Sequence, residues 1–213
     1  MAAWIEVVFL FSVAAIWTIA VLTPGPNLLA VLGVSARFGR LPALAAAIGV
    51  CTGTFVWGLA GWLGISTLFS AAPALYALLK ALGAGYLIWM GLNALIRAWK
   101  NDRPRTARIT TSVGGMRAAF VRGVSTNLSN PKTAIFVSSL FAATVPPDTG
   151  WQFGLATIAL MVSISLAWYA AMAFFFTIGV VANALGTIRR GIDAVAGTIF
   201  VAFGLHLAFS DQS

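Results

Sequence analysis

The sequence has very few charged residues: Asp, Glu, Lys and Arg together make up 8% of its 213 residues. An ordinary soluble domain carries roughly 25% charged residues. Hydrophobic residues make up 60% of the chain, and the mean hydropathy is +0.94. A soluble fold of this length could not bury so many apolar side chains, and a disordered chain has the opposite composition. The composition argues against a soluble enzyme and predicts a polytopic membrane protein with a single domain over residues 1–213.

Side chains that hold metals or perform acid–base chemistry are equally scarce. The chain contains one cysteine (Cys51), one histidine (His206) and five acidic residues. A metal site needs clustered carboxylate, imidazole or thiolate ligands, and a hydrolase needs a nucleophile beside a base. We therefore expect no metal, no cofactor and no catalytic residues. Two alternatives stay open: an intramembrane enzyme that pairs Ser125 or Ser129 with Lys132, and an exporter of metal or other cations.

Basic residues outnumber acidic residues by 13 to 5, which gives a net charge of +8. In a soluble protein this excess would indicate nucleic-acid binding, but in a membrane protein it is typical of cytoplasmic loops, so we expect no nucleic-acid partner. Most of the basic residues flank three of the expected connections between spans: Arg37, Arg40, Arg97, Lys100, Arg103, Arg105, Arg108, Arg117, Arg122, Arg189 and Arg190. The opposite side has Glu6, Asp148 and Asp211. Both termini should therefore lie outside and the 97–114 loop in the cytoplasm.

Long uncharged stretches predict six membrane spans, because a crossing needs about 20 apolar residues. Turn-forming residues divide the stretches into spans near 4–36, 42–67, 73–96, 115–145, 150–182 and 192–210. The beginning of the sequence, MAAWIEVVFL, has no Lys or Arg, unlike a signal peptide, so we expect the first span to be retained. The predicted fold class is an all-α, multi-pass membrane protein.

The first and fourth spans are long, and each has helix-breaking residues near its middle. The breaks are Thr23-Pro24-Gly25-Pro26-Asn27 and Asn127-Leu128-Ser129-Asn130-Pro131-Lys132. Proline has no N–H and clashes with the carbonyl four residues earlier. Pro24 should therefore free the carbonyl of Ala20, and Pro131 that of Asn127. Lipid cannot satisfy a freed carbonyl, so this backbone should line protein or a wet cavity. The alternative for either break is a plain proline kink.

The two breaks occupy equivalent positions in the two halves of the chain, since Pro24 and Pro131 are 107 residues apart. Shifting the first half by that distance places its three predicted spans on those of the second half. The pseudo-repeats cover about 1–100 and 111–213, and three spans per half require that the second half be inverted in the membrane. Inverted repeats with discontinuous helices are typical of transporters that bind substrate near the membrane midplane.

Each break ends one half-helix and starts another, which predicts the chemistry of the ligand. Helix N-termini suit an anion, and the carbonyls at a helix C-terminus suit an ammonium group. Two breaks that face each other would bind a zwitterion such as an amino acid. We expect Lys132 to supply charge to the substrate carboxylate. Hydrogen bonds should come from Thr23, Asn27, Asn127, Ser129 and Asn130, and the backbone shape from Pro24, Gly25, Pro26 and Pro131.

Four further residues are candidates for coupling or packing. Lys80 lies inside the third span, where a charge is costly, and Asp193 lies at the entrance to the sixth. Either could carry a proton, although Lys80 could snorkel and Asp193 could begin a helix or pair with Arg189 or Arg190. Gly49 and Gly53 form a GxxxG pattern that suits close helix contact. We expect that contact within one chain, with a homodimer contact as the alternative.

The motifs also resemble a known family. TPGPN at 23–27, FVRGVSTNLSNPKTAIF at 120–136, and the segment from Gly49 to Leu87 with Lys80 and GAGYL resemble the lysine exporter / homoserine–threonine efflux (LysE-type) family. The resemblance implies an exporter of amino acids in the bacterial inner membrane, working by alternating access as a proton antiporter. Exporters of basic amino acids in this family carry acidic residues within their spans, and LAAAIGVCTG at 44–53 has none. This favours threonine, homoserine, serine or branched-chain amino acids, with basic amino acids as the alternative.

Overall fold

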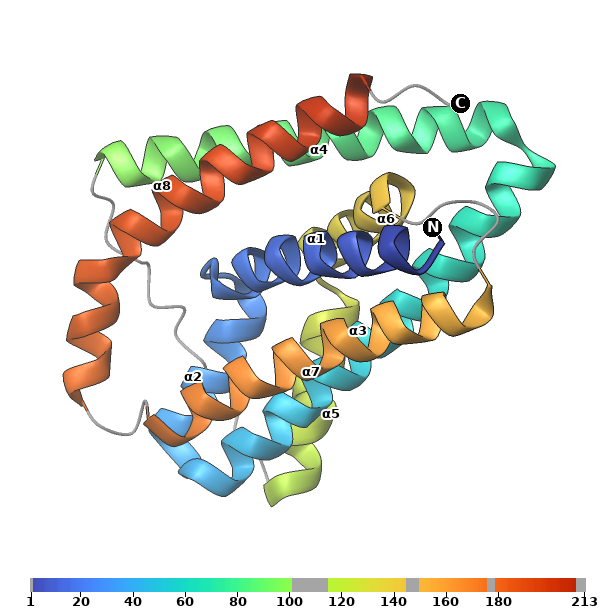
Figure 1. Ribbon diagram of the computed structural model, residues 1–213. Coiled ribbons are helices and arrows are strands. Elements are labelled where there is room, and N and C mark those ends of the chain that lie inside the picture. Colours follow the sequence, from blue (N-terminus) through green and yellow to red (C-terminus); the bar gives the residue numbers. More distant parts are fainter. Residues whose placement is uncertain (1, 101–114, 145–149, 176–178, 210–213) are drawn as a thin grey trace.

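A computed structural model describes residues 2–100, 115–144, 150–175 and 179–209, and all regular structure among them is α-helical (Figure 1). The all-α prediction is confirmed for these residues. The helices are α1 (Ala2–Leu22), α2 (Pro26–Phe38), α3 (Arg40–Ala71), α4 (Pro73–Lys100), α5 (Gly115–Leu128), α6 (Pro131–Thr144), α7 (Trp151–Phe175) and α8 (Gly179–Phe209). Positions 101–114, most of the predicted cytoplasmic loop, lie outside the described residues, as do Asp148 and Asp211.

Both predicted helix breaks are present. α1 ends at Leu22 and α2 begins at Pro26, with a bend of 53° between them. α5 ends at Leu128 and α6 begins at Pro131. A proline is favourable in the first turn of a helix because the N–H it lacks has no partner there. The prolines therefore act as starts of new helices.

The described helices support several membrane crossings but do not establish six. By length and composition, α3, α4, α7 and α8 can each cross a membrane. If the bent pair α1–α2 counts as one more span, the described residues provide up to five crossings. α5 and α6 are 14 residues long each, and α5 carries Arg117 and Arg122. A helix rises 1.5 Å per residue, so 14 residues cover about 21 Å, short of the roughly 30 Å hydrocarbon core. The fourth predicted span is therefore two half-length helices, and its crossing stays a prediction.

The last two predicted spans, 150–182 and 192–210, correspond to the candidate crossings Trp151–Phe175 and Arg190–Phe209, although the helix boundary between them differs. The span predicted over 150–182 ends as α7 at Phe175, and the span predicted over 192–210 is part of a helix that begins at Gly179. Arg189 and Arg190 lie within α8, not in a loop. Arginine is a good helix former, so a helix can continue beyond the membrane through such a pair of charges.

α4 and α8 run side by side in opposite directions along one side of the molecule, and they form the most extensive helix pair (Figure 1). Small residues allow this approach. A Cβ on Gly91 would lie 2.7 Å from the carbonyl oxygen of Gly197, and a Cβ on Gly197 would lie 2.8 Å from that of Gly91. The two backbones therefore touch at these positions, as in close helix pairs of membrane proteins.

α3 packs in a similar way against α5, and it also contacts α7. A Cβ on Gly49 would overlap the backbone of Phe120, and one on Gly53 would lie 2.7 Å from the Cβ of Asn127. Gly49 and Gly53 thus contact α5 of their own chain. Through this contact α3 determines where the end of α5, and with it the second break, is located.

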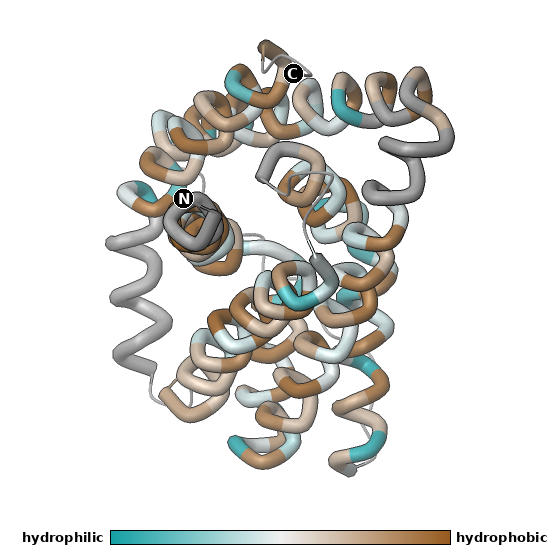
Figure 2. Tube along the Cα trace, turned by 45° about the vertical axis from the view of Figure 1, so that its right-hand side comes forward, coloured by the Kyte–Doolittle hydropathy of each residue, from teal (hydrophilic) through white to brown (hydrophobic). Residues whose placement is uncertain are grey.

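The outer surface is strongly apolar. Large side chains such as Phe11 (77% exposed), Trp99 (82%) and Phe209 (81%) project outward. Figure 2 shows hydrophobic positions along most of the helices and only scattered hydrophilic ones. Contact with lipid explains this exposure, because hydrocarbon solvates apolar side chains.

Candidate functional site

The two helix breaks, more than 100 residues apart in the sequence, meet in the structure. The Asn27 amide in the first turn of α2 donates from Nδ2 to Oγ1 of Thr133 in α6 (3.3 Å). Nδ2 of Asn130, at the second break, donates to Oδ1 of Asn27 (3.4 Å). All three side chains are buried. The contact joins the starts of two half-helices through side chains that form hydrogen bonds with one another.

Asn130 also determines how α6 begins. Its Oδ1 accepts a hydrogen bond from the backbone N–H of Lys132 at 3.0 Å, and its carbonyl accepts the backbone N–H groups of Thr133 and Ala134. This is the arrangement of an asparagine N-cap, which satisfies a donor at the start of the helix. The residue before Pro131 therefore starts α6 and links it to α2.

The first break exposes carbonyl groups at the end of α1, and the ammonium group of Lys132 lies beside them. Nζ of Lys132 is 3.5 Å from the carbonyl oxygen of Ala20 and 3.5 Å from that of Thr23. These distances are long for hydrogen bonds, but a full charge at this distance is attracted to two carbonyl dipoles. The Ala20 carbonyl is the one that Pro24 cannot satisfy. The positively charged Nζ of Lys132, in the first turn of α6, therefore lies against the C-terminal end of α1.

At the second break, the carbonyl of Asn127 accepts the backbone N–H of Asn130 at 3.1 Å and the indole N–H of Trp57 from α3 at 3.3 Å. The Asn127 side chain is fully buried, and its Nδ2 donates to Oγ1 of Thr54 at 3.2 Å. Thr54 in turn donates to the carbonyl of Val50. These bonds attach the end of α5 to α3 by both the backbone and the side chain of Asn127.

A pocket lies where the breaks meet, between α1, α2, α3, α6 and α7. It is lined by Trp17, Ala20, Val21, Thr23, Gly25, Asn27, Leu28, Thr54, Asn130, Lys132, Thr133, Phe136, Ser165 and Tyr169. None of these described residues carries a carboxylate. The pocket is narrow and has free space for only a few water molecules in this conformation. A larger ligand would have to widen it.

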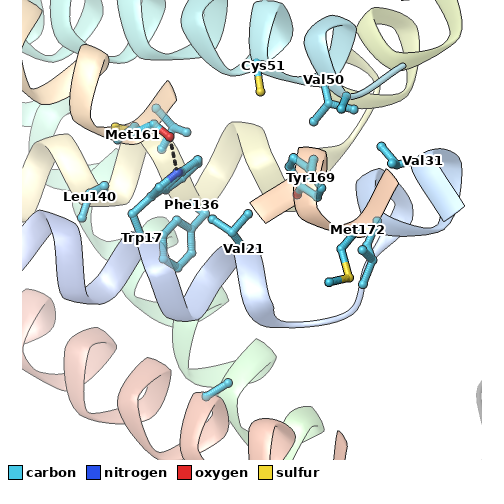
Figure 3. Close-up of a cluster of buried hydrophobic side chains, with 14 of the residues drawn as sticks. Trp17, Val21, Val31, Val50, Cys51, Phe136, Leu140, Met161, Tyr169 and Met172 are labelled. Carbon is cyan, nitrogen blue, oxygen red and sulfur yellow. Dashed lines mark hydrogen bonds between the residues drawn. The ribbon is translucent and has the colours of Figure 1, made fainter. Parts of the chain in front are cut away.

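One wall of the pocket is aromatic (Figure 3). Trp17 of α1 donates its indole N–H to the carbonyl of Met161 (2.9 Å) and to Oγ of Ser165 (3.0 Å), both on α7. Its ring lies 5.8 Å from that of Phe136, centroid to centroid, and Tyr169 lies on the same side of α7 as Ser165. Two residues four apart on a helix share a face. The wall combines apolar rings with polar ends, as ligand pockets commonly do.

The structure brings about half of the predicted site residues to the pocket: Thr23, Gly25, Asn27, Asn130 and Lys132. Pro24, Pro26 and Pro131 shape the breaks without lining it, and Asn127 is buried behind Thr54. Ser129 is exposed and lies outside the lining, as does Ser125. The hydroxyl of Thr23 donates to its own helix, at the carbonyl of Ile19.

The remaining candidates lie away from the pocket lining. Lys80 is half-buried on α4, and Asp193 is buried on α8 (3% exposed). Sequence reasoning missed Trp17, Thr54, Thr133, Phe136, Ser165 and Tyr169 as lining residues. A partial signal existed, since Thr54 and Ser165 are hydroxyl residues in apolar stretches and Tyr169 follows Ser165 by one helical turn.

A helical membrane protein in which two broken helices meet at a buried polar pocket has the arrangement of a secondary transporter. The family model of the LysE type translocators matches residues 18–211, so the chain belongs to this family. The resemblance drawn from the TPGPN and SNPK motifs is confirmed. The protein is therefore a membrane translocator and not an enzyme.

Similar proteins extend the comparison over nearly the whole chain. The chain is 28% identical over 200 residues to the threonine efflux protein of Salmonella typhi, covering 94% of this chain and 97% of the relative. It is 28% identical over 199 residues to the threonine efflux protein of Escherichia coli K12, covering 93% and 97%. An uncharacterised membrane protein of Pseudomonas aeruginosa is 35% identical over 198 residues, covering 91% of each chain. No solved structure matches the chain.

Proposed function

We propose that this protein exports neutral amino acids across the bacterial inner membrane by alternating access, in exchange for protons. The pocket between the two helix breaks carries the proposal. It presents carbonyl groups from the end of α1, the start of α6 and one lysine ammonium within a few ångströms of each other. Carbonyls attract an ammonium, whereas a helix start and a lysine attract a carboxylate. An α-amino acid carries both groups on adjacent carbons.

The absence of a carboxylate among the described lining residues favours neutral over basic amino acids. A second ammonium or a guanidinium in this pocket would meet Lys132 with no acidic partner, and a buried unpaired charge is costly. Export of basic amino acids is the second candidate function, and membership of the LysE type translocator family is compatible with it. The described residues contain no group of three His, Cys, Asp or Glu side chains that could hold a metal, so the ligand chemistry does not favour metal export.

Two relatives named threonine efflux proteins support an amino-acid substrate. The aromatic wall and the hydroxyl groups of Thr54 and Ser165 suit a side chain that is small and either apolar or hydroxylated, such as that of threonine, homoserine or serine. Branched-chain amino acids fit the same wall through apolar contact.

The proposed topology has six crossings in two inverted repeats, with both termini outside and residues 97–114 in the cytoplasm. The helix order supports it, because a broken pair followed by two long helices occurs twice: α1–α2, α3, α4 and then α5–α6, α7, α8. The packing supports it too, since α3 contacts the broken pair α5–α6 and α7 contacts the broken pair α1–α2. Substrate would enter from the cytoplasm and leave outside as the repeats rock around the breaks.

Proton coupling requires a titratable group that changes environment. Asp193 is the one acid among the side chains that the structure describes, and it is buried on α8. Lys80 is half-buried on α4. Both belong to the α4–α8 pair, outside the pocket lining, so they are candidates for coupling and not for substrate contact.

A growth test examines the proposed substrate class. Cells that express the protein are loaded with toxic analogues of neutral and of basic amino acids. We expect protection against neutral analogues, and Lys132→Met should abolish it while expression is unchanged. The matched control is Lys100→Met, which removes the same charge from an exposed position at the end of α4. Protection against basic analogues only would replace the neutral substrate class by the basic one.

A further inference from the structure

The ammonium of Lys132 occupies the part of the pocket that is best suited to an ammonium. Its Nζ lies between the carbonyl oxygens of Ala20 and Thr23, 3.5 Å from each. Both residues line the pocket where α1 ends at Leu22, and the carbonyl of Ala20 lacks its helical N–H donor because Pro24 has none. In the state described here, the lysine and the carbonyls satisfy each other.

A substrate ammonium and the lysine ammonium have the same charge and nearly the same size and donor geometry. Both need oxygen acceptors, and none of the described lining residues offers a carboxylate. The two groups therefore compete for the same pair of carbonyls. They cannot share them without placing two positive charges in contact within a narrow pocket.

The residue beside the ammonium leaves room for it to move. A Cβ on Gly25 would lie 3.8 Å from Nζ of Lys132, so a glycine here keeps that side of the ammonium open. The backbone of Gly25 is extended, with φ −160° and ψ −176°, a conformation that other residues adopt. The backbone therefore does not require glycine at this position. What glycine contributes is the open space beside Lys132.

We propose that Lys132 is a tethered occupant of the substrate-ammonium subsite, and that substrate binds by exchange with it. The incoming α-ammonium takes the carbonyls of Ala20 and Thr23, and the displaced lysine pairs with the substrate carboxylate. This inference rests on the proposed function and adds the order of contacts within it. Neither half of the exchange is favourable alone, because a simple amine leaves the lysine without acceptors and a simple acid leaves the carbonyls without donors.

The exchange makes the pocket selective for ligands that carry both groups. Three ligands of matched size test this: threonine, 1-aminopropan-2-ol (threonine without its carboxylate) and 3-hydroxybutanoate (threonine without its amine). The assay is direct binding to the purified, detergent-solubilised protein by calorimetry. Wild type should bind threonine and bind the other two at least about tenfold more weakly, the effect of one lost charged hydrogen bond.

The decisive variant is Lys132→Met, which empties the ammonium subsite and leaves the carbonyls in place. It should bind 1-aminopropan-2-ol at least about tenfold more tightly than wild type does, while threonine binding falls. Lys132→Gln is a second variant that keeps a polar side chain, and it should show the same gain for the amine if the methionine variant does not fold. Lys100→Met should match wild type for all three ligands.

Amine binding that is unchanged or weaker in both Lys132 variants would overturn the exchange. That outcome is distinct from failure of the proposed function, which would appear as no binding of any neutral amino acid to wild type. The amine comparison between wild type and variant is measured in either case.

Gly25→Ala supplies a kinetic test. The added methyl group is in ordinary contact distance of Nζ in the resting state, so binding of Lys132 to the carbonyls should persist and the protein should fold. The lysine would lose open space through which to leave, so substrate exchange should slow several-fold at saturating substrate. An exchange rate equal to that of wild type would contradict the movement of Lys132 past Gly25.

Discussion

Replacing Gly53 by alanine should separate α3 from α5 at the point where α5 ends beside the pocket. The new Cβ would lie 2.7 Å from both Cβ and Oδ1 of Asn127. Carbon atoms normally approach to about 3.5–4.0 Å, so the helices must move apart by about 1 Å. Cβ is fixed to the backbone of α5, and a change of side-chain rotamer cannot relieve the clash.

The cost of Gly53→Ala can be estimated from these contacts. Overpacking of this kind costs about 1–3 kcal/mol. A 1 Å separation also breaks the 3.2 Å hydrogen bond from Asn127 to Thr54, which adds about 1 kcal/mol. The gain in helix propensity from glycine to alanine offsets about 0.5–1 kcal/mol. The net loss is about 1–3.5 kcal/mol of folding free energy.

The assay is thermal unfolding of the purified protein in detergent. For a chain of this size the loss corresponds to a melting temperature lower by about 2–14 °C. The matched control is Gly85→Ala on α4, where an added Cβ meets no atom within 4 Å. That variant should melt at or slightly above the wild-type temperature. If Gly53→Ala melts together with Gly85→Ala, the close approach of α3 and α5 at Asn127 is refuted.

Three further substitutions address the hydrogen bonds around the pocket. Trp17→Phe removes the buried donor to Met161 and should lower the free energy of unfolding by about 1–3 kcal/mol. Trp89→Phe, at a position 61% exposed, should change it by less than about 0.5 kcal/mol, and equal losses in both would contradict the role of the indole N–H. Asn27→Leu should reduce substrate exchange in liposomes about tenfold, because it cuts the link between the two breaks. Thr54→Val leaves the Asn127 amide without its acceptor and should lower the melting temperature by a few degrees; no change would show that water replaces the hydroxyl.

The helix breaks could be predicted from the sequence because their cause is local. A proline lacks its own N–H wherever it stands, so Pro24 and Pro131 interrupt the helical hydrogen bonds without reference to the rest of the fold. Asn130 next to Pro131 is a helix-start signal of the same local kind. In the structure α2 begins at Pro26, two residues after Pro24, and α6 begins at Pro131, directly after Asn130.

Contacts between distant segments could not be predicted, because they depend on how the helices are rotated and shifted against each other. The sequence indicated separately that the end of α1 suits an ammonium and that Lys132 suits a carboxylate. It did not show that Lys132 itself reaches the carbonyls of Ala20 and Thr23, 112 and 109 residues away. The hydrogen bonds from Trp17 to Met161 and from Trp57 to Asn127 also depend on how distant helices pack, so they could not be predicted either.

The start of α8 differs from the predicted boundary for another reason. Arg189 and Arg190 interrupt the uncharged stretches, so the sequence predicts a connection between spans there. The helix continues through both residues, although Gly191 follows directly, because arginine is a good helix former. Charge indicates which side of the membrane a segment occupies, whereas helix ends depend on capping and breaking residues.

The central claim is that the pocket between the breaks carries neutral amino acids across the membrane. The most direct measurement is exchange of labelled amino acids by the purified protein in liposomes, tested with a panel of the twenty standard amino acids against liposomes without protein. We predict saturable exchange of threonine or another neutral amino acid, and little exchange of lysine or arginine. Failure of every member of the panel to exchange, with folded protein in the liposomes, would contradict the claim.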